Sequence, residues 1–175
     1  MQPRGFTLTE ALVAMTMFAL LLAVAAPSFA VWLAEIRLRN AAHALADAIA
    51  LARSEAIKHS GRATLCKSLD RQRCTTTGGW ESGWLLFLDE NRNATREADE
   101  PIVRIEPAAE RGITARANQP LANYVSFTAL GHARLVSGAL QMGTFVVCRP
   151  GSRAYNVVLA NTGRVRVDRS ASVCP

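Results

Sequence analysis

The chain has no charged residue between Ala11 and Ala34 and no cysteine before Cys66. It also lacks the G-x-S-x-G, P-loop and zinc-protease motifs, which argues against the enzyme classes that depend on them. The three histidines are scattered and no two cysteines form a C-x-x-C pair, so the sequence predicts no zinc site. We therefore expect no catalytic residues, no metal site and no cofactor.

Lysine is almost absent as well. The sequence has 18 arginines but only 2 lysines, and its formal net charge is +6. The planar fork of arginine suits phosphate and carboxylate recognition, although a GC-rich genome produces the same bias without functional meaning. The total number of arginines therefore does not distinguish anion recognition from compositional bias. Their clustering along the chain has to be considered instead.

The uncharged run from Ala11 to Ala34 has 24 residues. As a helix it would be about 36 Å long, enough to cross the ~30 Å hydrocarbon core of a bilayer. Glu10 stands at the head of this run, where an ionised group is costly unless it finds a partner. A secretory signal is cleaved after its apolar core, whereas here the small residue Gly5 precedes the core. Cleavage at Gly5 would remove a short leader and keep the membrane segment.

This arrangement resembles the prepilin leader of type IV pilins and type II secretion pseudopilins. The motif is matched position by position at Gly5, Phe6, Thr7, Leu8 and Glu10. The resemblance implies that prepilin peptidase cleaves between Gly5 and Phe6 and that Phe6 is N-methylated. It implies that the free amine of Phe6 on a neighbouring subunit pairs with Glu10 during assembly, and that Pro27 kinks the first helix. A plain signal anchor is the alternative.

Beyond the membrane segment the hydrophobic pattern predicts one helix followed by short strands. Apolar residues recur at three- and four-residue steps over 35–58, and Ser60-Gly61 is a reasonable stop. The fold class is then α+β, with a long N-terminal helix packed on antiparallel sheet or a β-sandwich. We expect a leader at 1–5, a transmembrane helix at 6–34 and a globular domain at 35–175. The expected strands are 62–67, 84–88, 102–105, 113–116, 124–128, 144–148, 155–160 and 165–167.

The second half of the chain narrows the resemblance. Ala52-Arg53-Ser54-Glu55-Ala56-Ile57, followed by Cys66, Trp80, Gly83-Trp84, Phe87 and Asp89, is similar to the GspH/FimT/FimU group of minor pilins and pseudopilins. We interpret Trp80 and Trp84 as core residues of the sheet, with ligand stacking as the alternative.

All the cysteines lie beyond the membrane segment. Their even number, in a part of the chain expected outside the cytoplasm, indicates two disulfides among Cys66, Cys74, Cys148 and Cys174. One sequence does not determine how they pair.

The acidic segment from Asp89 to Glu100 places oxygen-bearing side chains at positions 1, 3, 5, 7, 9 and 12, the spacing of an EF-hand calcium loop. However, Ala94 occupies position 6, where the sharp turn requires glycine, and strands rather than helices are expected on both sides. Arg92 and Arg96 also fall inside the would-be cage. We therefore favour a solvated loop between two strands over a calcium site.

The C-terminal segment is basic. Within Gly163-Arg164-Val165-Arg166, glycine can turn the chain, and a strand starting there would send both arginines to the same face. Two adjacent guanidinium groups suit consecutive phosphates of a nucleic acid, although a solvated strand face explains the same pattern. Further arginines in or beside this segment are Arg149, Arg153 and Arg169.

The segment resembles the G-R-x-R motif of FimT-type minor pilins, which bind DNA during natural transformation. The resemblance implies non-specific binding of double-stranded DNA through phosphates, with little stacking because only Tyr155 lies nearby. A Cys148–Cys174 disulfide would hold this segment, which would leave Cys66 to pair with Cys74.

Two readings therefore remain for the function. One is a minor pilin that binds DNA for uptake, and the other is a FimU- or GspH-like pilus or secretion subunit that never touches DNA. Both imply a single-pass inner-membrane protein with a periplasmic domain, which later joins the tip of a fibre. Both imply the same further partners: prepilin peptidase, membrane lipid, and major and minor pilins.

Overall fold

The computed structural model describes residues 7–175 of the 175-residue chain. One helix, α1 (Leu8–Lys58), starts the described part, and it stays helical through Pro27. Contacts divide the chain into a unit up to Arg37 and a compact unit from Leu38 to Pro175. The part of α1 in the first unit is apolar and long enough to cross a membrane, and none of its most apolar stretch is buried.

From Leu38 onward α1 is amphipathic, as the sequence predicts. Its buried positions recur every three or four residues, so that one stripe faces the core of the second unit. The helix ends at Lys58, where Ser60 adopts a positive φ of 49° and the N–H of Gly61 donates to the carbonyl of Ala56 at 3.1 Å. This is the usual way in which a helix C-terminus satisfies its last carbonyls. The buried residues of α1 are Leu38, Ala42, Leu45, Ala46, Ala48, Ile49, Ala52 and Ala56.

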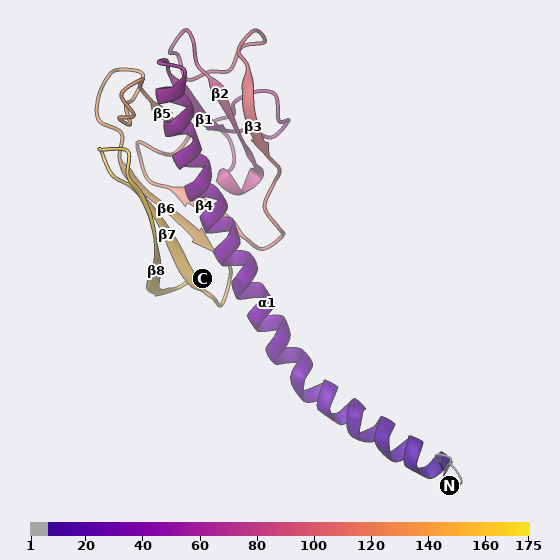
Figure 1. Ribbon diagram of the computed structural model, residues 1–175. Coiled ribbons are helices and arrows are strands. Elements are labelled where there is room, and N and C mark those ends of the chain that lie inside the picture. Colours follow the sequence, from indigo (N-terminus) through magenta and orange to yellow (C-terminus); the bar gives the residue numbers. More distant parts are fainter. Residues whose placement is uncertain (1–6) are drawn as a thin grey trace. The chain divides into compact units, whose positions relative to one another are not determined.

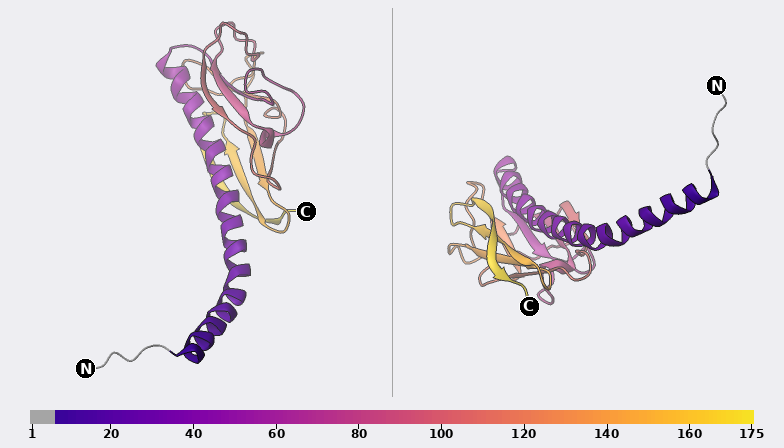
Figure 2. Two further views of the ribbon diagram at one scale, coloured as in Figure 1. Left: turned by 90° about the vertical axis from the view of Figure 1, so that its right-hand side faces the viewer. Right: turned by 90° about the horizontal axis from the view of Figure 1, so that it is seen from below.

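The rest of the second unit consists of two four-stranded antiparallel sheets (Figures 1 and 2). The first has the order β3-β2-β1-β5, with β1 (Ala63–Lys67), β2 (Trp84–Leu88), β3 (Ile102–Glu106) and β5 (Tyr124–Phe127). The second has the order β4-β6-β7-β8, with β4 (Thr114–Ala117), β6 (Gly143–Cys148), β7 (Arg153–Leu159) and β8 (Val165–Val173). A short 3₁₀ helix, η1 (Trp80–Ser82), precedes β2. The predicted α+β class is confirmed.

Each expected strand overlaps an observed one, but the last is longer than predicted. β8 continues to Val173 because its backbone stays paired with β7 as far as Arg153. The sequence predicted a strand ending at Val167, since the polar residues that follow have no strand pattern of their own. An edge strand exposes much of its surface, so polar side chains are tolerated there.

One hydrophobic core joins the buried stripe of α1 to both sheets. Trp80 lies inside it, donating from Nε1 to the carbonyl of Leu121 at 3.1 Å and packing edge-on against Phe145. Trp84 is also buried. Both tryptophans are core residues, which agrees with the interpretation made from the sequence.

Candidate nucleic-acid interface

A tight turn connects β7 to β8 and carries the Gly-Arg-x-Arg segment. The N–H of Gly163 donates to the carbonyl of Ala160, and the N–H of Ala160 donates to the carbonyl of Arg164, each at 2.9 Å. Gly163 has a φ of 81°, a conformation that favours glycine. A Cβ atom there would also lie 2.5 Å from the carbonyl oxygen of Gly131. The backbone conformation and the close approach both require glycine at this position.

Arg164 and Arg166 lie on the outer face of the second sheet. Arg166 is paired with Val158 of β7, whose neighbours Val157 and Leu159 face the core. Both arginines are exposed and, with residues of β7 and the turn, they line one hollow in the surface. The structure therefore brings the two guanidinium groups together on one side of the hairpin.

The two arginines differ in what they contact. Arg166 forms an exposed ion pair with Asp168, with Nε and Oδ2 2.7 Å apart. Within residues 7–175, the side chain of Arg164 makes no hydrogen bond or ion pair. An exposed ion pair contributes only about 0–1 kcal/mol, so a phosphate could displace Asp168 at little cost. Arg164 is free to bind an anion directly.

The other three predicted DNA contacts lie elsewhere, which corrects the grouping made from the sequence. Arg169 is paired with Tyr155, whose ring is buried, and so it lies on the opposite face from Arg166. Arg153 is paired with Val173, six residues along the hairpin from the turn, or about 20 Å at 3.3 Å per residue. Arg149 is half-buried, and its Nη1 atom is shielded from solvent.

The structure pairs the cysteines as Cys66–Cys74 and Cys148–Cys174. The second bond joins the end of β6 to the residue that follows β8. It therefore fixes the end of the hairpin that is opposite the Arg164 turn. The first closes a small loop after β1. The described residues include no free cysteine.

Arg53 of α1 also lies beside the Gly163 turn, and sequence reasoning missed it. A Cβ atom on Gly163 would lie 3.3 Å from Cδ of Arg53, and one on Gly131 would lie 3.0 Å from its Nε. The side chain is half-buried. In the sequence Arg53 is only a polar position on an amphipathic helix, because which turn meets that helix depends on tertiary packing.

The Asp89–Glu100 loop is not simply solvated, because its two end carboxylates are buried. Asp89 accepts the N–H groups of Asn93 and Ala94 and the hydroxyl of Thr64, at 3.0, 3.1 and 2.7 Å. Glu100 accepts the N–H groups of two further loop residues, and its burial raises the pKa of its carboxyl. These oxygens close the loop on itself, and residues 7–175 hold no cluster of three metal-binding side chains.

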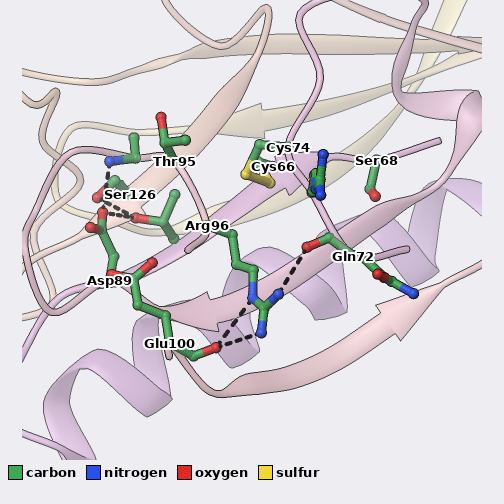
Figure 3. Close-up of a disulfide and its surroundings, with 12 residues drawn as sticks. Cys66, Ser68, Gln72, Cys74, Asp89, Thr95, Arg96, Glu100 and Ser126 are labelled. Carbon is green, nitrogen blue, oxygen red and sulfur yellow. Dashed lines mark hydrogen bonds between the residues drawn. A yellow bond between two sulfur atoms is a disulfide. The ribbon is translucent and has the colours of Figure 1, made fainter. Parts of the chain in front are cut away.

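Arg96 connects this loop to the disulfide loop. It donates from Nε and Nη2 to the carbonyl of Glu100, and from Nη1 to the carbonyl of Gln72 at 3.3 Å (Figure 3). Gln72 lies inside the loop closed by Cys66 and Cys74. An arginine that the sequence placed inside a would-be cation cage therefore holds two loops together.

At the start of α1, Glu10 accepts hydrogen bonds from the N–H and the hydroxyl of Thr7, both at 2.9 Å. It is exposed, so the pairing with a neighbouring subunit stays a prediction. Gly5 and Phe6 lie outside the described residues.

Comparison with known proteins gives two family matches. Residues 41–163 match the family described as type II transport protein GspH, and residues 1–26 match the prokaryotic N-terminal methylation motif. No curated protein matches the chain significantly in sequence.

Solved structures of two proteins are similar to this fold. The type IV minor pilin FimU of Pseudomonas aeruginosa is 19% identical, with a TM-score of 0.58 over 79% of this chain and 96% of that one. The minor pseudopilin EpsH from the type 2 secretion system of Vibrio cholerae is 11% identical, with a TM-score of 0.52 over 78% of this chain and 99% of that one. At these identities the similarity shows the fold alone.

Proposed function

Since this chain belongs to the GspH family of type II transport proteins, we propose that it is a minor pilin of a type IV pilus that captures double-stranded DNA. Three observations support a role as a fibre subunit. They are the family match, the N-terminal methylation motif and the exposed apolar half of α1. The exposed arginine pair of the β7–β8 hairpin supports the DNA-binding role.

In this proposal prepilin peptidase removes residues 1–5 by cleaving between Gly5 and Phe6, and Phe6 is methylated. The protein then waits in the inner membrane as a single-pass subunit, with lipid around residues 6–34 and residues 35–175 in the periplasm. Assembly with major and minor pilins carries the globular unit to the pilus tip. Glu10 would exchange its contacts with Thr7 for the amine of a neighbouring Phe6.

The unpartnered guanidinium group of Arg164, beside Arg166 in one hollow, is the observation that carries DNA binding. Guanidinium groups bind phosphate oxygens through two parallel hydrogen bonds, which provides affinity without reading sequence. Tyr155, the aromatic residue of the neighbouring strand, is buried, so it offers no face on which a base could stack. The interface therefore suits a duplex held by its backbone.

The rival function is a structural subunit of a pilus or secretion fibre that binds no DNA. The ion pair between Arg166 and Asp168 favours it, because it neutralises one of the two cations in the hollow. The dispersal of Arg149, Arg153 and Arg169 favours it too, since it leaves a smaller cluster than the sequence suggests. Both functions share the fold and the N-terminal motif, so only DNA binding separates them.

We expect the full chain, kept soluble in a non-ionic detergent, to shift duplex DNA in a gel at low ionic strength. Two 20-base-pair duplexes of unrelated sequence should shift at the same protein concentration, because phosphate contacts do not distinguish bases. A shift for only one duplex would contradict the phosphate-based interface. No shift for either would leave the structural subunit as the function.

A further inference from the structure

A second cationic hollow lies where α1 ends. Its walls come from three segments far apart in the sequence: residues 60–62 after α1, the loop after β2, and the turn after β5. Each segment contributes one arginine, namely Arg62, Arg92 and Arg134. None of them belongs to the Gly-Arg-x-Arg segment, and nothing in the sequence groups them.

Two of these arginines are held in place by the fold. Arg62 is half-buried and donates from Nη1 to the hydroxyl of Ser126 at 3.1 Å. Arg134 is also half-buried and donates from Nη1 to the carbonyl of Gly138 at 3.4 Å. Each bond occupies one corner of a guanidinium fork with five N–H donors, so other donors remain for a ligand. Positions fixed in this way lose little entropy when an anion binds.

The third arginine, Arg92, is exposed and has a positive φ of 64°. Within residues 7–175 its side chain makes no hydrogen bond or ion pair. The backbone conformation is uncommon for a residue other than glycine, asparagine or aspartate. The loop fixed by Asp89 and Glu100 presents this residue at the hollow.

The charge around the hollow favours an anion. Among the residues that the structure describes, its lining has three arginines and His132 but no carboxylate. Glu90 lines an adjoining hollow together with Arg62 and Arg92. The buried carboxylate of Asp89 is linked to Arg62 through the hydroxyls of Thr64 and Ser126. Two carboxylates beside three guanidinium groups leave a net positive charge. A phosphate group, which accepts several charge-assisted hydrogen bonds, matches such a site.

A close backbone approach links the segments that carry the two hollows. Gly131 lies in the turn after β5, between residues that line the second hollow, and its carbonyl oxygen is 2.5 Å from where a Cβ atom on Gly163 would lie. Gly163 directly precedes Arg164 of the first hollow. In Figure 1 the β7–β8 turn lies beside this segment, near the C-terminal end of α1. The half-buried Arg53 lies against both glycines.

We propose that the hollow of Arg62, Arg92 and Arg134 binds a second phosphate group of the duplex held at Arg164 and Arg166. This inference rests on the proposed function and extends its interface across two touching turns. A duplex carries one negative charge per ~1.7 Å of its axis, so a surface that continues past one phosphate site meets further phosphates.

The test compares duplex binding by the full chain in non-ionic detergent with that of an Arg92→Asn, Arg134→Gln variant. Asparagine tolerates the positive φ at position 92, and Arg62 is left in place because it holds Ser126. Loss of two phosphate contacts should weaken binding roughly 100-fold at low salt. It should also make the slope of log K against log salt shallower by about 1.8, or 0.9 per contact.

A matched control removes the same charge elsewhere, as Arg39→Gln with Arg111→Gln. Residues on both sides of Arg111 line a hollow together with Ala41, which is two residues from Arg39 in α1. Arg39 and Arg111 therefore lie toward the start of the globular unit's part of α1, whereas the proposed site lies where α1 ends. The control should bind like the wild type. Arg92→Asn alone, which removes no side-chain contact within the described residues, should make the slope shallower by about 0.9 without affecting folding.

The outcomes separate the two proposals. If the wild type binds and the Arg92/Arg134 variant keeps the slope of the control, the second site is wrong and the proposed function stands. If the wild type binds no duplex at low salt, both are wrong. A shallower slope in the variant and in Arg92→Asn, but not in the control, supports the second site.

Discussion

Replacing Arg164 and Arg166 together by alanine should abolish the shift of duplex DNA while the domain stays folded. Both side chains are exposed, and the one bond they make within residues 7–175 is the ion pair with Asp168, so their loss should change stability by less than about 0.5 kcal/mol. A hydrogen bond to a charged group contributes about 1.5–3 kcal/mol, and two such contacts would therefore account for roughly a 100-fold loss of affinity or more. Fluorescence anisotropy with a labelled duplex measures that loss, and circular dichroism checks the fold.

Two further variants sharpen this prediction. Asp168→Asn removes the carboxylate that competes with phosphate for Arg166, so it should tighten binding. Arg153→Ala removes an exposed arginine at the far end of the same hairpin and should have little effect. Equal losses in Arg153→Ala and in the Arg164/Arg166 variant would mean that net charge, not the hollow, binds DNA.

Replacing Asp89 by alanine should lower the free energy of unfolding by about 3–5 kcal/mol. The carboxylate is fully buried and accepts three hydrogen bonds, two from the backbone of its own loop and one from Thr64 of β1. Alanine would leave the N–H of Ala94 buried without an acceptor, which costs about 1–3 kcal/mol. It would also remove a charged acceptor from the N–H of Asn93 and the hydroxyl of Thr64, which keep only the neutral oxygens of Asn91 and Ser126. Thermal and urea unfolding of the full chain in detergent measure the change.

Asp99→Ala is the matched control, because this residue lies in the same loop but is exposed. It should change stability by no more than about 0.5 kcal/mol. Asp89→Asn keeps one acceptor oxygen and should fall between the two. If Asp89→Ala were as stable as Asp99→Ala, the carboxylate would not be what closes the loop.

The sequence predicted the elements of this fold well because their signals are local. The stripe of α1 from Leu38 onward has the helical period, and β2 is a short apolar run between Gly83 and Asp89. The turn at Gly163 was also predictable, since glycine followed by alternating residues is typical of a strand that starts after a turn.

What the sequence could not supply depends on register and tertiary contact. Arg169 was grouped with Arg166 because the last strand was expected to end at Val167; β8 continues past it, and the two-residue period of a strand then places the two arginines on opposite faces. Arg153 is far from the turn only because β7 and β8 pair as one long hairpin. The buried ends of the acidic loop and the meeting of Arg53 with two glycines follow from packing between distant segments.

The most direct test of the account is the salt dependence of duplex binding by the wild-type chain in non-ionic detergent. An interface made of two to five phosphate contacts predicts a straight line of log K against log salt with a slope between about −2 and −5. Binding should be measurable at low ionic strength and largely lost at high salt. A slope near zero, or no binding even at the lowest salt, would contradict DNA capture through Arg164 and Arg166.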